Sequence, residues 1–245
     1  MTTFEVGSVT ARGGFANEKA VCRKFNNWKE DEDARLWLKV MGYNLDKIDS
    51  VEAIHIPSRI KREDVATLGL NENFEDLMRF KKADAQIRIT VRLGGVISVE
   101  NISLKKANSD ADYNQVDKRW VDTYKEIWRF DENVRLALKL FTGEINPSLK
   151  SNILKNINPR DNRRIFLDEL PDDLKNKVIT FFENNKILVV SDIIKGRGGL
   201  SANWMLVTRY NRDDSTTSWI LKDINTVMNF LEQAKSKSHQ EVVFI

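Results

Sequence analysis

The chain has 245 residues, 41% of them hydrophobic, which is enough to bury one sizeable core or two closely joined lobes. Its 39 Lys and Arg against 36 Asp and Glu give a formal net charge of +3, which is too small to indicate nucleic-acid binding by itself. The single cysteine excludes an internal disulfide, and the absence of a signal peptide or a bilayer-length apolar run predicts a cytoplasmic protein without a membrane partner.

Hydrophobic spacing divides the chain into alternating helices and strands. In chain order we predict a helix over residues 15–28, a helix over 32–41, a strand over 51–56, one helix around 73–80, strands over 85–93 and 96–104, helices over 113–130, 133–141 and 172–184, strands over 186–194, 204–210 and 216–221, and a helix over 224–234. This order predicts an α/β fold of the mixed α+β kind, in which helices flank a sheet.

Two polar stretches interrupt these elements. The polar sequence of residues 58–79 predicts a surface segment outside the main fold, which we call the excursion. It is either a flap over a binding site or an insertion without a role. Residues 146–164 are rich in Asn, Pro and Arg, which is typical of a linker. We therefore expect a first domain over residues 1–145 and a smaller C-terminal α/β lobe over 165–245 that packs closely on it.

The stretch over residues 83–106 predicts a β-hairpin that gathers polar side chains. Apolar residues alternate along its first strand, and two glycines at 94–95 turn the chain back. With a two-residue turn, two cross-strand pairs share one face: Asp84 with Lys105, and Gln86 with Ser103.

A carboxylate, a lysine and two small polar groups at the open end of a hairpin are typical of a metal-dependent phosphodiesterase site. Asp84 supplies a hard oxygen ligand for magnesium, and Lys105 stabilises charge on phosphorus or orients the attacking water. Ser103 is a weaker ligand than a carboxylate, so the site is short of negative charge. From spacing alone, an exposed ion pair between Asp84 and Lys105 is the alternative.

Three side chains are candidates for the missing ligand: Gln86, Glu18 and Glu100. Strand alternation puts Glu100 on the opposite face, which makes it the poorest of them. Glu18 lies at the edge of the apolar stripe of the first helix, where it either leans inward or stays solvated. Cys22 on that stripe is predicted to be a small core residue, and the two histidines lie far apart without cysteine partners, which argues against zinc.

Several segments resemble the HinP-type restriction endonucleases, which recognise the tetranucleotide GCGC. They read GSVTARGGFANEKA at 7–20, NNWKE…WL…MGYNLDKI at 26–48, NQVDKRW at 114–120, FTGE at 141–144 and DIIKGRGG at 192–199. That family is similar in fold to the PD-(D/E)XK nucleases, and its active-site pattern is Ser-Asp followed by Gln-x-Lys. The corresponding positions here are Ala83-Asp84 and Ser103-Leu104-Lys105.

The resemblance implies a type II restriction endonuclease that hydrolyses double-stranded DNA with Mg²⁺, as a monomer or weak homodimer. On this basis the first domain has a PD-(D/E)XK core and carries catalysis, and the C-terminal lobe binds DNA. The resemblance and the hairpin together give Asp84, Gln86, Ser103 and Lys105 as the expected catalytic residues, and Asp84, Ser103 and Glu18 as the expected metal ligands. Gln86 and Glu18 come from the shortage of negative charge at the hairpin and not from the resemblance.

On the same resemblance, residues that follow the hairpin contact DNA. Asn114, Gln115 and Lys118 are the types that read base edges, and Tyr113 is suited to wedge between base steps. Arg197 lies in a loop with three glycines, where it reads a guanine or grips a phosphate. Turn geometry alone explains those glycines equally well.

Two alternatives to a restriction endonuclease stay open. Ser103 favours a sequence-specific DNA-binding protein that has lost cleavage. A repair or nicking nuclease of the same fold is the other, and the products formed on unmodified duplex DNA distinguish it from a restriction enzyme.

Overall fold

The computed structural model describes residues 16–70, 73–91, 96–108, 119–150, 152–154, 157–210 and 216–233. The chain divides into two compact units, each made of two segments. The first unit combines Met1–Tyr113 with Ile194–Phe230, and the second combines Asn114–Ile193 with Leu231–Ile245. This division does not follow the expected linker over residues 146–164, which lies inside the second unit.

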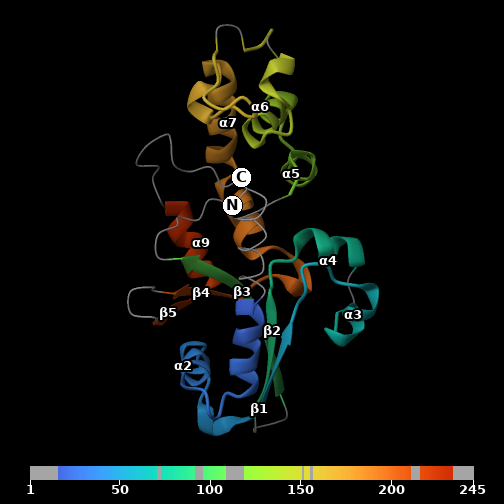
Figure 1. The fold of residues 1–245 in the computed structure, drawn as a ribbon. Helices are drawn as coiled ribbons and strands as arrows, with labels where there is room; N and C mark the ends of the chain where they lie inside the picture. The colour runs from blue at the N-terminus through green and yellow to red at the C-terminus, as the bar shows by residue number, and fades with distance from the viewer. Residues whose placement is uncertain are drawn as a thin grey trace. The chain divides into compact units, whose positions relative to one another are not determined.

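The first unit is built on one five-stranded sheet with the strand order β1-β2-β3-β4-β5 (Figure 1). The strands are β1 (Ile48–His55), β2 (Ala85–Val91), β3 (Val96–Asn108), β4 (Trp204–Tyr210) and β5 (Thr217–Asp223). Neighbouring strands are antiparallel except β3 and β4, which are parallel. This mixed sheet confirms the fold class, and it includes the two late strands that we expected in a separate C-terminal lobe.

Strands β2 and β3 form the predicted hairpin, but in a different register. Four residues, 92–95, separate the two strands where we predicted a two-residue turn. Gln86 consequently pairs with Asn101. The same register, continued by one residue, brings Ser103 and not the lysine opposite Asp84. Because the register differs by an even number of residues, the predicted assignment of side chains to faces is kept.

Helices cover both faces of this sheet. The N-terminal helix (residues 16–26) and α2 (Glu32–Val40) bury Phe25, Trp37 and Leu38 against one face. Figure 1 shows α3 (Arg62–Thr67) and α4 (Phe74–Phe80) beside β1 and β2. A second apolar cluster here contains Ile56, Leu68 and Leu77. The polar excursion over residues 58–79 therefore contributes to the core of the first unit.

The helix boundaries follow from capping residues. Asp31 precedes α2 and accepts a hydrogen bond from the backbone N–H of Ala34 at 3.0 Å. Asp131 does the same for α6 (Glu132–Thr142), and Gly143 ends that helix with a φ of 79°. A short polar side chain at a helix start accepts hydrogen bonds from the first backbone N–H groups. A glycine at the helix end tolerates the left-handed backbone that stops the helix.

The second unit is helical and packs around aromatic side chains. Its main helices are α5 (Val121–Trp128), α6, α7 (Asp172–Asn184) and α8 (Lys186–Val190). Tyr124 and Trp128 stack with ring centroids 4.4 Å apart. Asp192 is fully buried and accepts from the guanidinium of Arg119 at 2.8 Å and from the Trp128 indole at 3.1 Å. This buried ion pair ties the last residues of the unit's first segment to the start of α5.

The predicted strand over residues 186–194 is wrong. This segment is α8 followed by a π-helical turn at Ser191–Lys195. Its buried residues recur at helical spacing, namely Val189, Val190, Ile193 and Ile194. A short apolar run buried on most sides has no clear period, so helix and strand are hard to separate from sequence.

The remaining elements are short turns and one helix. Single 3-10 turns occur at Leu45–Lys47, Pro147–Lys150, Leu167–Glu169 and Gly198–Leu200, and α9 spans Ile224–Gln233. No helix in the part of the chain that the structure describes has the length and apolar character needed to cross a lipid bilayer.

Candidate active site

Asp84 lies where β2 begins, with its backbone bonded to both neighbouring strands. Its N–H donates to the carbonyl of Ile102 at 2.9 Å, and its carbonyl accepts from the N–H of Ile56 at 3.0 Å. Ala83 and Ala85 on either side are fully buried. These contacts fix the backbone of Asp84 between β1 and β3.

The carboxylate of Asp84 reaches across to β3. Its Oδ2 accepts from the backbone N–H of Leu104 at 2.7 Å and lies 3.5 Å from the hydroxyl of Ser103. Both contacts use Oδ2, so Oδ1 has no hydrogen bond to any residue in the described ranges. One oxygen thus holds the strand pair together, and the other is available to a ligand.

Lys105 lies two residues beyond Ser103 on β3, on the same face of the strand. The predicted pairing of Lys105 directly opposite Asp84 is wrong, because the longer connection before β3 shifts the register. Within the residues that the structure describes, the Lys105 ammonium forms no ion pair. The alternative of a simple ion pair between Asp84 and Lys105 therefore does not describe this site.

Gln86 shares the face of Asp84 but hydrogen-bonds elsewhere. It is 1% exposed, accepts from Arg88 Nε at 3.1 Å, and has its Nε2 3.5 Å from the amide oxygen of Asn101. Asn101 in turn donates to the carbonyl of Gly199 at 2.7 Å. The Gln86 amide is thus engaged in the interior of the first unit.

Glu18 leans inward, as one of the two sequence interpretations required. Its carboxylate lies 2.8 Å from Nε2 of His55, and only 17% of its side chain is exposed. The adjacent Asn17 lies 3.2 Å from the hydroxyl of Thr208 on β4, which holds the start of the N-terminal helix near the sheet. Glu100, expected on the opposite face, accepts from the indole of Trp204 at 2.9 Å, in agreement with that expectation.

Lys81 is a charged residue near this site that the sequence reasoning missed. Burial lowers its pKa below the ordinary lysine value, Asp84 and Glu18 oppose that change, and Lys105 adds to it. These effects identify the charged groups around the Lys81 ammonium. The available signal was its position three residues before Asp84, in a basic pair with Lys82.

Cys22 confirms its predicted role as a core residue. It is 6% exposed and belongs to the apolar cluster under the N-terminal helix. Burial, with a smaller contribution from Glu18, raises the pKa of its thiol to about 11. A thiol of this kind stays protonated near neutral pH and is a poor nucleophile.

The glycine-rich loop before β4 packs against the segment that leads to Asp84. Gly196 has a φ of +74°, and a Cβ there would lie 2.2 Å from the carbonyl oxygen of Phe80. The N–H of Arg197 donates to that oxygen at 3.2 Å, and its guanidinium lies 5.0 Å from the Phe80 ring centroid. Close backbone approach thus accounts for Gly196.

The other predicted DNA-contacting residues are Tyr113, Asn114, Gln115 and Lys118, and they lie outside the described residues. Arg197 is described and has an exposed side chain.

The residues around Asp84 fit a sparse magnesium site. The Asp84 carboxylate is a hard anionic donor, and the Ser103 hydroxyl lies 3.5 Å from its Oδ2. Among the described residues, no group of three or more His, Cys, Asp or Glu side chains could hold a metal ion. Magnesium commonly uses one or two carboxylates and retains several waters, so this donor set is compatible with it.

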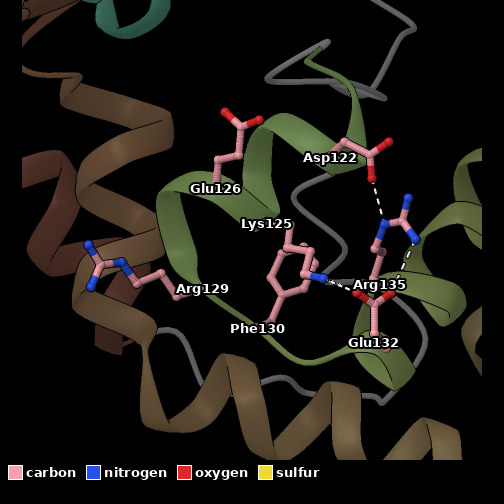
Figure 2. Close-up of a pocket in the computed structure, with 7 residues that line it drawn as sticks. All are labelled: Asp122, Lys125, Glu126, Arg129, Phe130, Glu132 and Arg135. Carbon is pink, nitrogen blue, oxygen red and sulfur yellow. Dashed lines mark hydrogen bonds and ion pairs between the residues drawn. The ribbon is translucent and has the colours of Figure 1, made fainter.

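A surface pocket of the second unit holds charged side chains that pair with one another (Figure 2). Arg135 donates to Asp122 at 2.6 Å and to Glu132 at 3.1 Å, and Lys125 pairs with Glu132. Hydrogen bonds from Arg135 and from Lys139 lower the pKa of Asp122 to about 2. These carboxylates are engaged in surface ion pairs, so this pocket is a weaker candidate than the Asp84 site.

Comparison with known proteins identifies a family for this chain. The model of the R.HinP1I restriction endonuclease family matches residues 75–241, which include Asp84, Ser103 and Lys105. No curated protein matches the chain by direct sequence comparison. A solved structure of restriction endonuclease MspI in complex with its cognate DNA is similar, with a TM-score of 0.56 and 13% identity over 93% of this chain and 79% of that chain. At this identity the likeness shows the fold alone.

Proposed function

This chain belongs to the R.HinP1I restriction endonuclease family, and we propose that it cleaves double-stranded DNA at GCGC with Mg²⁺ as its cofactor. Family membership makes it a type II site-specific endonuclease that acts on DNA. The observation that carries the proposed Mg²⁺-dependent cleavage is the placement of Asp84 against Ser103 and Leu104, with Lys105 next on the same strand. The GCGC site rests on the resemblance to the HinP-type enzymes.

The proposed chemistry divides between Asp84 and Lys105. Asp84, with the Ser103 hydroxyl 3.5 Å from its Oδ2, would hold Mg²⁺. When bound there, the metal would polarise the phosphodiester and lower the pKa of water. Lys105 orients the attacking water and stabilises the negative charge that develops on the phosphate oxygens. We assign Glu18 and Gln86 supporting roles, since His55 engages the first and Asn101 the second.

For DNA recognition we propose the residues that follow the hairpin together with Arg197. Asn114, Gln115 and Lys118 read base edges, Tyr113 wedges between base steps, and Arg197 contacts a guanine or a phosphate. The exposure of Arg197 at the surface supports its part in this proposal. MspI, which is similar in fold, was solved with its cognate DNA.

Cleavage of defined duplexes tests this function. Purified protein is incubated with Mg²⁺ and a plasmid carrying one GCGC site, beside plasmids in which that site is changed to CCGG or GCCC. We expect one linear product from the GCGC plasmid and none from the others. Cutting at another sequence would overturn the GCGC assignment, and accumulation of nicked circles would favour a nicking nuclease.

One observation favours a second candidate, a DNA-binding protein that has lost cleavage. Ser103, opposite Asp84, is a neutral hydroxyl where the family pattern has glutamine. Bound but uncut GCGC duplex would support this candidate. In that case Ser103→Gln, which restores the family residue, is expected to restore cleavage in the same plasmid assay.

A further inference from the structure

Lys81 has a backbone that is fixed on both sides. It is the C-cap of α4, and its N–H donates to the carbonyl of Leu77 at 2.9 Å. On the following side, the N–H groups of Lys82 and Ala83 both donate to the carbonyl of Leu200 at 3.0 Å. A side chain that starts from such a fixed backbone can be held for a specific contact.

The glycine loop completes this support. The Phe80 carbonyl just before Lys81 accepts from the N–H of Arg197, and Gly196 allows the loop to approach closely. Asn101, two residues before Ser103, donates to carbonyls of the same loop at Gly199 and at Ser201, at 2.7 and 3.0 Å. One loop thus supports both Lys81 and the strand that carries Lys105.

The carboxylates around Lys81 have hydrogen-bond partners, whereas the lysines do not form ion pairs with the described residues. Asp84 receives a hydrogen bond from Leu104, and Glu18 lies against His55. Neither carboxylate lies within ion-pair distance of Lys81, and Lys81 forms no ion pair with any other residue in the described ranges. Lys105 likewise forms no ion pair with a described residue. Two ammonium groups near Asp84 therefore lack an anionic partner in the described protein.

We propose that Lys81 is a second phosphate-binding lysine of the active site, which contacts a non-bridging oxygen of the phosphodiester that is cut. This rests on the proposed cleavage of DNA and adds a residue to it. Two lysines and one magnesium-binding carboxylate suit a dianion-like transition state, because fixed cations stabilise the charge that develops on phosphate oxygens. The lowered pKa of Lys81 agrees with this role, because burial disfavours the charged ammonium and a bound phosphate would stabilise it.

The unfavourable burial of the Lys81 charge distinguishes a functional lysine from one that stabilises the fold. Because burial disfavours the charged form of Lys81, its replacement by methionine removes a buried charge and retains an apolar stem of similar length. We expect Lys81→Met to melt at or above the wild-type temperature. Loss of function in this variant is then not a result of unfolding.

DNA binding without divalent metal is the first test. Fluorescence anisotropy gives the Kd for a GCGC duplex over a range of NaCl concentrations, for wild type, Lys81→Met, Lys81→Arg and the control Lys39→Met, which changes an exposed lysine on α2. Loss of one phosphate contact lowers the slope of log K against log salt by about 0.9. We expect that change for Lys81→Met alone, with Lys81→Arg close to wild type.

Single-turnover cleavage with Mg²⁺ is the second test. We expect Lys81→Met to cut about 100-fold more slowly, in the range of a lost transition-state donor. Once wild-type cutting has located the scissile linkage, a duplex with an uncharged methylphosphonate there removes the proposed partner. Binding of this duplex without metal is expected to be equally tight for wild type and Lys81→Met.

The outcomes separate this inference from the proposed function. If wild type binds GCGC duplex but cuts nothing, the cleavage proposal fails, and the salt slopes still decide whether Lys81 contacts phosphate. If wild type cuts and Lys81→Met retains both its rate and its salt slope, the inference is overturned. If Lys81→Met still bound the methylphosphonate duplex more weakly than wild type did, the assignment to the scissile phosphate would also be overturned.

Discussion

The two oxygens of Asp84 have different surroundings, and this predicts how the site responds to substitution. Asp84→Asn retains an oxygen that accepts from the Leu104 N–H, but it removes the negative charge of the carboxylate. We expect a near-native melting temperature and a loss of at least about 100-fold in Mg²⁺-dependent cleavage. Cleavage rate against Mg²⁺ concentration, with thermal melting, measures both.

Glu18→Gln is the matched carboxylate-to-amide change in the same unit. Because the Glu18 carboxylate already lies against His55, we expect it to change the Mg²⁺ requirement less than Asp84→Asn does. A larger shift in Glu18→Gln would assign Glu18 as a direct ligand and reduce Asp84 to a role in strand pairing.

Lys105 lacks an ion-pair partner among the described residues, which predicts a role outside the stability of the fold. Lys105→Ala is expected to abolish detectable cleavage and leave binding of GCGC duplex within a few-fold of wild type, as for a group that acts mainly in the transition state. Gel-shift and cleavage assays on the same duplex compare the two. Near-normal cutting by Lys105→Ala would remove this residue from the catalytic set.

These residues also mark what a single sequence can predict at this scale. Alternation along a strand is local, so the shared face of Asp84, Ser103 and Lys105 follows directly from their positions. The partner across the hairpin depends on the length of the connection, and residues 92–95 shift it by two positions. Lys81 was missed because two of the charged groups around it, Glu18 and Lys105, come from distant segments.

At the scale of elements, the glycine loop before β4 supports the strands that carry the site. Gly196→Ala introduces both a disfavoured φ and a Cβ 2.2 Å from the Phe80 carbonyl oxygen, whereas Gly69→Ala has a similar φ of +68° and no atom within 4 Å. We expect Gly69→Ala to lower the free energy of unfolding by about 1–2 kcal/mol. Gly196→Ala should lose about 1–3 kcal/mol more, as for an overpacked site.

Urea unfolding followed by tryptophan fluorescence measures this difference. Equal losses in the two variants would mean that the loop moves aside easily, and the proposed support of Lys81 by this loop would then be wrong. The cleavage rate of Gly196→Ala, measured under conditions where the variant is folded, is a second test. If the loop supports Lys81, its displacement is expected to slow cutting.

The same scale explains which elements are predictable. Amphipathic helices such as α2 and α7 have one apolar face, and their period identifies them. The segment over 186–194 is apolar on most positions and was assigned to the wrong type. The helix α3 is too short to have a clear period and was not predicted.

For the whole molecule, the sequence indicates the mixed sheet and the strands of Asp84 and Lys105, but not the division into units. The parallel pairing of β3 with β4 joins residues about one hundred positions apart, such as Ile102 with Trp204. Nothing local in either strand specifies that pairing. A polar stretch such as 146–164 resembles a linker whether it joins two domains or lies inside one of them.

The two units are expected to respond to opposite ends of the pH scale. In the first unit, burial raises the pKa of Cys22 from near 9 to about 11 and that of Tyr43 from near 10 to about 12. A raised pKa in the folded state stabilises it below the unfolded pKa, so this stability is lost as pH rises from about 9 to 12. For Cys22 the loss is on the order of 2–3 kcal/mol.

The second unit has the opposite dependence through Asp122. Hydrogen bonds from Arg135 and Lys139 lower its pKa from near 3.8 to about 2, so the stability it provides is present above about 3.8 and lost as pH falls toward 2. Urea unfolding across pH measures both limbs. We expect Cys22→Ala to flatten only the alkaline limb and Asp122→Asn only the acid limb. If Cys22→Ala left the alkaline limb unchanged, or Asp122→Asn left the acid limb unchanged, the assignment of that limb to the substituted group would be wrong.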